Sequence, residues 1–278
     1  MSIENIPEIY IEKASDLKDL FVYDLKMQHN IVKTKVTLTR HMFSFLQTGE
    51  KQVNLAEDSI KINNNQSLLI KKGNCIWSEL IDKEKENYYC KLLFFSEKRL
   101  REFLSKHVNS TSEKEVTPSH FVIRNDSYIN TYLNSLSTIM PAPPLFMNNL
   151  LSVKFEELLL YLLNKYKKPF EAYLHSLVNE DTSPFKKVIN QNIHSNLGLE
   201  EIAFLCNMSL STFKRRFVKE YGCSPGRWFK EKRLLKVKEL LSDGNITPSD
   251  IYLDFGYNNL SNFSVAFKKR FGINPSEI

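Results

Sequence analysis

The chain has 278 residues, a length typical of about two domains. Its composition, 42% hydrophobic and 25% charged residues, argues against disordered, collagen-like and disulfide-scaffold classes. Lysine and arginine exceed aspartate and glutamate by 38 to 32, and this net charge of +6 permits an acidic partner without naming one.

The cysteines and the amino terminus favour a cytoplasmic protein. Four cysteines are scattered without the spacing of a metal site or a disulfide framework, so we expect reduced thiols. Residues 1–10 lack the basic and apolar stretches of a signal peptide, and the longest apolar run is only Leu158–Leu163. We therefore expect no secretion and no membrane segment.

Short runs rich in β-branched and aromatic residues occupy residues 21–95. Polar clusters such as Thr48-Gly49-Glu50 separate them, which is typical of strands joined by turns. The pattern predicts an antiparallel sandwich or a small cupin-like barrel. The predicted strands include Lys35–Thr39, Met42–Leu46, Ser67–Lys71, Cys75–Leu80 and Tyr88–Phe95.

After Ser96 the apolar residues recur with helical spacing. Leu100, Phe103 and Leu104 predict one helix, and a second is predicted to end near Ile139. A third helix, which ends before Pro169, has an apolar stripe that serves either as core or as the self-association surface of a homodimer. This stripe consists of Leu151, Phe155, Leu158, Leu159 and Leu162, and a further helical piece follows at Phe170–Val178.

The polar segment 179–183 marks the predicted domain boundary. It divides the chain into a β-rich domain with appended helices, residues 1–178, and an all-α domain, residues 179–278. The predicted fold class is therefore α+β.

An internal repeat dominates the second domain. Phe213, Phe217, Gly222 and Pro225 recur, at a constant offset of 50, as Phe263, Phe267, Gly272 and Pro275. Two copies of one pattern must form equivalent supersecondary units.

Capping residues place the helices of this repeat. Ser224 and Thr247 each precede a proline, and Asp250 completes an approximate capping box with Thr247. Glycines 222, 244 and 272 stand where left-handed helix ends are expected. The predicted helices are Pro184–Asn192, Leu199–Cys206, Leu210–Glu220, Pro225–Leu241, Pro248–Phe255 and Leu260–Arg270, with a possible stub at the end.

Each repeat therefore has the form of a helix-turn-helix unit, whose second helix enters the major groove of DNA. The outward faces of the two second helices contain Ser, Asn, Arg and Lys, with no carboxylate before Glu220, which suits phosphates and base edges better than a plain solvated face. The candidate DNA-contacting residues are Ser211, Thr212, Lys214, Arg215, Lys219, Ser261, Asn262, Ser264, Val265, Lys268 and Lys269.

The positive charge is concentrated in the same region. Ten basic residues lie between Lys214 and Lys238, against only Glu220 and Glu231. This excess predicts that the first helix-turn-helix unit is the stronger electrostatic anchor on DNA.

Over residues 184–275 the sequence resembles the AraC/XylS family of bacterial transcription regulators. The motifs that carry the resemblance include Phe213-Lys214-Arg215-Arg216-Phe217, Gly222-Cys223-Ser224-Pro225, Phe255-Gly256-Tyr257, Ser261-Asn262-Phe263-Ser264 and Phe271-Gly272-Ile273-Asn274-Pro275. The resemblance implies that helix Pro225–Leu241 is a rigid connector, which lets two recognition helices reach major-groove segments about 34 Å apart. It also implies a promoter-binding activator that contacts RNA polymerase.

The resemblance assigns base contacts to Ser211, Lys214 and Arg215 in the first unit, and to the corresponding helix of the second, including Ser264. One position departs from the family. Val265 stands where a basic residue is frequent, so it either packs against a thymine methyl or leaves the second unit to rely on Lys268 and Lys269.

The first domain resembles the family's regulatory domain more loosely, through stretches such as Phe43–Glu50 and Leu68–Gly73. The resemblance implies that this domain takes a small-molecule effector, binds a regulatory protein or dimerises, and it does not choose among them.

Enzymatic readings find little support in the sequence. None of the six histidines stands in an H-x-H pair, and His41 in the strand region is expected to be a surface or satisfied interior residue, not a metal ligand. No nucleotide-binding or nucleophile motif occurs, so we expect no catalytic residue, metal or cofactor. Two alternatives stay open: a DNA-binding protein with an enzymatic first domain, as in DNA repair, and a non-catalytic ligand or interaction module.

Overall fold

The computed structural model describes residues 3–11, 19–56, 58–108, 118–139, 143–178, 185–195, 197–243 and 246–278. Internal contacts divide the chain into two compact units, Met1–Thr182 and Ser183–Ile278. The polar segment 179–183, predicted as the domain boundary, lies outside the described residues, as does the predicted cap residue Gly244.

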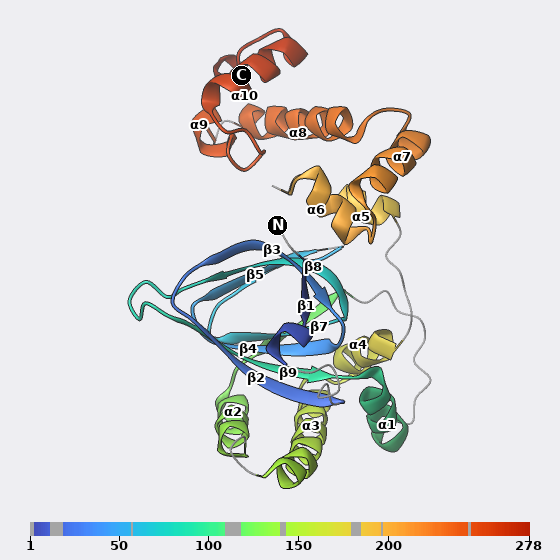
Figure 1. Ribbon diagram of the computed structural model, residues 1–278. Helices are drawn as coiled ribbons and strands as arrows, with labels where there is room; N and C mark the ends of the chain where they lie inside the picture. Colours follow the sequence, from blue (N-terminus) through green and yellow to red (C-terminus); the bar gives the residue numbers. More distant parts are fainter. Residues whose placement is uncertain are drawn as a thin grey trace. The chain divides into compact units, whose positions relative to one another are not determined.

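The first unit contains a sandwich of two five-stranded sheets (Figure 1). The described strands pair only within their own sheet, so the sandwich, and not a closed barrel, is the architecture of this region. All described pairs are antiparallel except β1 with β3. In spatial order one sheet consists of β1 (Ile3–Ile6), β3 (Ile31–Leu38), β8 (Gly73–Leu80), β5 (Glu50–Asn54) and β6 (Ser59–Ile62), and the other of β10 (His120–Arg124), β7 (Gln66–Ile70), β4 (His41–Thr48), β9 (Tyr88–Phe95) and β2 (Leu20–Met27).

The sheet that contains β4 is buried on both faces. Because side chains alternate along a strand, Met42 and Leu46 pack between the two sheets, whereas Phe43 and Phe45 pack against helices. Figure 1 shows these helices together on the outer side of that sheet. They are α1 (Glu97–His107), α2 (Ser127–Ile139), α3 (Pro144–Tyr166) and α4 (Lys168–Val178).

The helical periodicity predicted all four helices. Ser96 caps α1 by accepting a hydrogen bond at its Oγ from the backbone N–H of Arg99, at 3.3 Å. Asp126 caps the start of α2 in the same way, through the N–H of Ile129 at 3.0 Å. Between α3 and α4, Lys167 adopts a φ of 52°, which ends one helix and reorients the chain for the next.

The apolar stripe of α3 proves to be core. Its members, Leu151, Phe155, Leu158, Leu159 and Leu162, are all at most 3% exposed and pack among side chains of the sheet and of the other helices. The prediction that these residues form a self-association surface is therefore wrong, because the stripe is already covered within one protomer.

One buried ion pair lies inside the sandwich. Lys51 and Glu79 face each other across β5 and β8, with Nζ and Oε1 2.9 Å apart and both side chains at most 2% exposed. The Tyr88 hydroxyl donates to the same carboxylate at 3.0 Å, and Lys51 Nζ lies 4.1 Å from the centroid of the Trp77 ring. These partners offset part of the cost of burying two charges.

The second unit contains two helix-turn-helix units and a connector, as predicted. The first unit of the repeat is α6 (Leu199–Leu205) with α7 (Leu210–Tyr221), preceded by α5 (Phe185–Gln191). The connector is α8 (Pro225–Ser242), and the second unit of the repeat is α9 (Pro248–Ile251) with α10 (Leu260–Phe271). A short 3₁₀ turn, η3 (Pro275–Glu277), matches the predicted stub.

The second unit of the repeat departs from the prediction at one helix. The helix predicted over Pro248–Phe255 ends as α9 at Ile251, and turns follow it. Gly256 has a φ of 82°, a left-handed conformation that directs the chain out of the helix. The predicted capping box is present, since both the backbone N–H and the hydroxyl of Thr247 donate to Asp250 Oδ2, at 2.8 and 2.6 Å.

Candidate nucleic-acid interface

The start of α7 is fixed by a cluster of hydroxyl groups. The Oγ of Ser209 accepts a hydrogen bond from the backbone N–H of Thr212 at 3.2 Å, and it lies 3.0 Å from the Oγ of Ser211. The positive end of the helix dipole therefore coincides with exposed hydroxyl groups. This is the local arrangement that binds phosphate oxygens at helix N-termini.

The two faces of α7 differ completely. Phe213 and Phe217 are fully buried and contact aromatic side chains of α5 and α8. The predicted contact residues Ser211, Thr212, Lys214, Arg215 and Lys219 are all exposed. Gly222, with a φ of 71°, ends the helix as predicted.

The second recognition helix, α10, repeats this construction. Asn259 Oδ1 accepts a hydrogen bond from the backbone N–H of Asn262 at 2.8 Å, and Gly272 ends the helix with a φ of 81°. Phe263 and Phe267 are buried. The predicted residues Ser261, Asn262, Val265, Lys268 and Lys269 are exposed, and Ser264 is half-buried on the flank.

The basic side chains of the two helices have different roles in the structure. Arg216 pairs with Glu220 at 2.7 Å and lies over the ring of Phe185, and Arg270 pairs with Glu231 of α8 at 2.6 Å. In contrast, Lys214, Arg215, Lys219, Lys268 and Lys269 form no ion pair within the described part of the chain. These five cations are available to an external anion.

The connector α8 packs on the second helix-turn-helix unit through an apolar core, and it contacts the first through Phe229, which lies against Phe217, and through one arginine. Leu234, Val237 and Leu241 of α8 pack with Phe263 and Phe267. Arg233 of α8 donates three hydrogen bonds to the segment between α5 and α6. Its Nε donates to the carbonyl of Ile193 at 3.1 Å, and its Nη2 donates to those of Ser195 and Leu197 at 2.7 and 3.0 Å.

Sequence reasoning missed three features of this interface. The caps of the recognition helices are Ser209 and Asn259, which the Ser or Asn preceding each helical pattern could have indicated. Ser224, which we predicted as a side-chain cap, makes no capping hydrogen bond. The anchoring role of Arg233 depends on carbonyls about 36 to 40 residues away and left no local signal.

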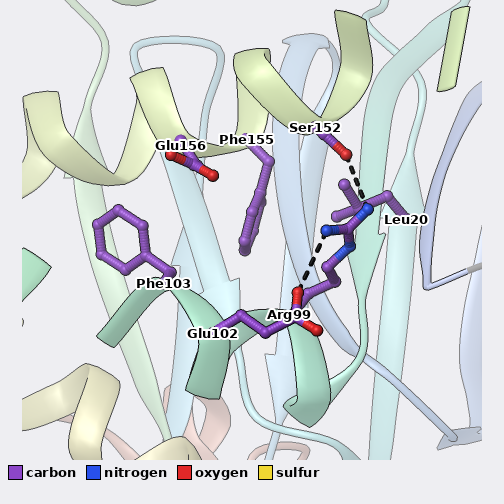
Figure 2. A pocket seen from close by; sticks show the side chains of 7 residues that line it. All are labelled: Leu20, Arg99, Glu102, Phe103, Ser152, Phe155 and Glu156. Atoms are coloured by element: carbon purple, nitrogen blue, oxygen red, sulfur yellow. Dashed lines mark hydrogen bonds and ion pairs between the residues drawn. The ribbon is translucent and has the colours of Figure 1, made fainter. Parts of the chain in front are cut away.

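The first unit contains a small cavity between α1 and α3 that does not suit an effector. Figure 2 shows Arg99 bridging these helices, with Nη2 2.8 Å from Ser152 Oγ and Nη1 3.2 Å from Glu102 Oε2. The free space is about 20 Å³. That volume accommodates about one water molecule, so the bridge is structural.

Three further findings concern metal binding, the environment of His41 and membrane-spanning helices. The described residues include no group of three or more His, Cys, Asp or Glu arranged to hold a metal ion. His41 lies in the interior, where its Nδ1 accepts a hydrogen bond from the backbone N–H of Lys72, but its Nε2 has no partner among the described residues. His41 is thus an interior residue, held by a hydrogen bond at Nδ1. No described helix combines the length and hydrophobicity that a membrane span requires.

Each of the two units matches a different known domain family. The ExsA N-terminal regulatory domain matches residues 41–173, and a helix-turn-helix domain matches residues 202–278. Both units are thus similar to domains of AraC/XylS-type transcription regulators.

Individual curated relatives match over a limited part of the chain. The virulence regulon transcriptional activator VirF of Yersinia enterocolitica is 34% identical over 92 residues, which are 33% of this chain and 34% of VirF. The HTH-type transcriptional regulator ExsA of Pseudomonas aeruginosa is 38% identical over 69 residues, 25% of each chain. The match thus spans about a third or less of the length of these curated relatives.

A solved structure is similar along nearly the whole chain. It is the apo form of a single-substitution variant of ToxT from Vibrio cholerae. The similarity covers 94% of this chain and 97% of that chain, at 14% identity and a TM-score of 0.44.

Proposed function

We propose that this protein is a sequence-specific DNA-binding transcription regulator that acts in the cytoplasm as an activator at promoters. The observation that carries the proposal is the pair of recognition helices, α7 and α10, which present exposed polar and basic faces while α8 packs against both units. Two such helices on a common connector suit successive major-groove segments of one duplex.

Within α7 the exposed residues divide into base-reading and phosphate-binding groups. Arg215 is exposed and forms no ion pair with a described residue, and a guanidinium can donate two parallel hydrogen bonds to a guanine edge. Ser211 and Thr212, at the helix N-terminus, suit a phosphate. We therefore assign base discrimination to Arg215 and positioning to the hydroxyl cluster.

Within α10 the balance shifts toward apolar and phosphate contacts. Val265 is 68% exposed, and an exposed valine on this face suits the methyl group of thymine. Lys268 and Lys269 are exposed near the other end of the helix, about two turns from its N-terminus, and suit backbone phosphates.

Substitution of one residue in each helix tests this division. Arg215→Ala should lower the ratio of specific to non-specific affinity, because a bidentate base contact contributes about 1–3 kcal/mol of discrimination. Lys268→Ala should weaken binding to all sequences about equally. Binding sites for the assay come from mapping the protein across its own genome. Unchanged specificity ratios in both variants would show that the assignment is wrong.

The salt dependence of binding tests the prediction that the first helix-turn-helix unit is the stronger electrostatic anchor on DNA. The double variant Lys214→Ala/Lys219→Ala, which keeps the base-reading Arg215, should reduce the slope of log affinity against log salt more than Lys268→Ala/Lys269→Ala does. The two pairs are matched in charge and exposure, so equal slopes would refute the asymmetry.

The first unit is the proposed regulatory part. We infer that it controls DNA binding or contact with RNA polymerase through a small-molecule effector, a regulatory protein or dimerisation. Its support is the regulatory-domain match at residues 41–173 and the covered sheet on which four helices pack.

A homodimer is proposed through the outer face of α3, opposite the buried stripe. Phe146, Val153 and Leu160 are spaced by seven residues and are 57%, 63% and 43% exposed. Seven residues are nearly two helical turns, so the three side chains form one line. In an antiparallel pair centred on Val153, Phe146 of one protomer meets Leu160 of the other.

Sedimentation of the full chain tests this dimer. Val153→Asp should shift the protein to monomer, because it places a charge at the centre of the apolar line. Val32→Asp, at a valine of β3 that is 55% exposed, is the matched control and should leave the oligomeric state unchanged. A dimer that persists in the Val153 variant would exclude this face.

A further inference from the structure

A pocket of about 240 Å³ opens at the N-terminus of α1, where strand β4 begins and strand β9 ends. The residues that matter to its chemistry are Arg40, His41, Lys72, Glu97 and Lys98, which line it together. They come from three different parts of the chain, so the fold has assembled the pocket. It is distinct from the DNA-contacting helices, which belong to the other unit.

The pocket carries a net positive charge. Among the lining residues, the cations are Arg40, Lys72 and Lys98, and the one carboxylate is that of Glu97, which pairs with Lys72 at 2.6 Å. Lys98 lies 3.8 Å from the carboxylate of Asp19, outside the lining, so Arg40 is the cation that forms no ion pair with a described residue. Burial lowers the pKa of His41 to about 3, so its ring is neutral at physiological pH. The N-terminal turn of α1, an eleven-residue helix, adds the positive end of its dipole on the same side.

The pocket also contains buried donors that lack an acceptor. Because the backbone N–H of Lys72 donates to His41 Nδ1 at 3.1 Å, the neutral ring carries its proton on Nε2. That nitrogen is buried, as is Nε of Arg40, and neither has a hydrogen-bond partner among the described residues. The backbone carbonyl of Leu177 is a polar neighbour of the ring and raises its pKa, but it lies outside hydrogen-bond geometry with Nε2.

Unpaired buried donors are costly, and they are expected where a ligand or another group supplies the missing acceptor. Here two of them occur in one pocket with excess positive charge. We propose that this pocket binds a compact oxyanion, either a phosphate or a small carboxylate, as the effector of the regulatory unit. This proposal rests on the regulatory role proposed above for the first unit.

The pocket is connected to the end of α4, the last described helix of the first unit. Arg101 lies 3.7 Å from Glu97, and its Nη2 donates to the carbonyl of Val178 at 2.6 Å. Lys71, next to the pocket lysine, donates to the carbonyl of Ser176 at 2.9 Å. A bound anion would pair with Lys72 and break its ion pair with Glu97. The freed carboxylate of Glu97 would then pair more strongly with Arg101, which weakens the hydrogen bond from Arg101 to the carbonyl of Val178.

Titration of the full chain tests binding without reference to DNA. Inorganic phosphate and acetate are titrated separately, with sodium chloride at matched ionic strength as the control. We expect saturable one-to-one binding of at least one of them by calorimetry, and a shift of the His41 imidazole in the ¹H–¹⁵N spectrum. The arm that saturates identifies the ligand as phosphate or carboxylate. No saturable binding in either arm would overturn the proposal.

Substitutions assign the binding to the pocket. Arg40→Gln and Lys72→Gln should each weaken binding at least tenfold, whereas Lys61→Gln, at a surface lysine paired with Glu50, should leave it unchanged. Binding that survives both pocket substitutions would place the anion elsewhere and overturn the proposal. The imidazole shift is measured on the unsubstituted chain, so it tests the site even if a variant fails to fold.

Hydrogen exchange tests the connection to α4. Amides of residues 176–178 should exchange faster with the saturating anion than with chloride, and an unchanged rate would refute the connection. DNA affinity is then measured with and without the anion. A chain that binds the anion but no promoter fragment would refute the regulatory function while leaving the site intact.

Discussion

Arg233 is predicted to be the residue on which the geometry of the DNA-binding unit depends most. Its guanidinium donates three hydrogen bonds, of 3.1, 2.7 and 3.0 Å, to carbonyls between α5 and α6, while its helix packs against the second recognition unit. Arg233→Ala removes all three at once. The substitution should therefore loosen the first helix-turn-helix unit relative to α8.

The free energy of unfolding lost in Arg233→Ala depends on the three hydrogen bonds and on how easily water replaces them. Hydrogen bonds to a charged group contribute about 1.5–3 kcal/mol each, but three that share one donor group do not add fully. A neighbouring pocket of about 290 Å³, lined by Arg233 itself, lets water reach the exposed carbonyls after truncation. We therefore expect a loss of about 2–4 kcal/mol in the free energy of unfolding of this unit.

The assay uses the distribution of tryptophan in the chain. The two tryptophans are Trp77, buried in the first unit, and Trp228, in α8. In a Trp77→Phe background, Trp228 fluorescence follows denaturation of the second unit alone. Arg227→Ala, an exposed position of α8, is the matched control and should change stability by less than about 0.5 kcal/mol.

A conservative substitution separates charge from geometry. Arg233→Lys keeps the charge, but a single ammonium cannot reproduce the guanidinium's fork of donors, so most of the loss should remain. Promoter affinity should fall in parallel, since the two recognition helices no longer hold a fixed spacing. If Arg233→Ala is as stable as the Arg227 control and binds the promoter normally, the anchoring role is refuted.

Three further predictions concern stability. Glu79→Gln leaves Lys51 buried without a counter-charge and should cost about 3–5 kcal/mol in chemical denaturation, a loss that Lys51→Met in the same chain should largely reverse. Gly256→Ala should cost about 1–2 kcal/mol, read as a lower Tm, because φ is 82° and the new Cβ would lie 3.2 Å from Arg233 Nη1; an unchanged Tm would contradict this. Burial lowers the pKa of His41 from its usual 6.5 to about 3 in the folded protein, so the unfolded chain takes up a proton first as pH falls. Relative to His41→Asn, the wild type should therefore lose about 2 kcal/mol in its free energy of unfolding between pH 8 and pH 5. Parallel pH profiles of the two proteins would refute this pKa.

The sequence predicted the second unit better than the first because the information there is local. Caps such as Thr247 with Asp250, and left-handed ends such as Gly222, depend on residues within one turn. The shortened α9 is also a local effect, since Gly256 turns the chain soon after Ile251. Exposure of the predicted contact residues followed directly from the position of the buried phenylalanines on each helix.

The first unit was less predictable because its partners lie far apart in the sequence. Strand β5 was missed since Lys51 breaks its apolar pattern, and its counter-charge Glu79 is 28 residues away. Strand β10 follows α1 and pairs with β7, about fifty residues earlier. Both faces of α3 carry apolar residues, so periodicity alone could not tell which face packs on the sheet and which stays exposed.

The length and spacing of the DNA contact test the central claim most directly. Hydroxyl-radical footprinting of the full chain on a promoter found by genomic mapping should show two protected segments about one helical turn, ~34 Å, apart on one face of the duplex. Arg215→Ala should weaken protection mainly in one segment, and Lys268→Ala mainly in the other. A single protected segment, or two that respond equally to both substitutions, would contradict the account of two recognition helices on one connector.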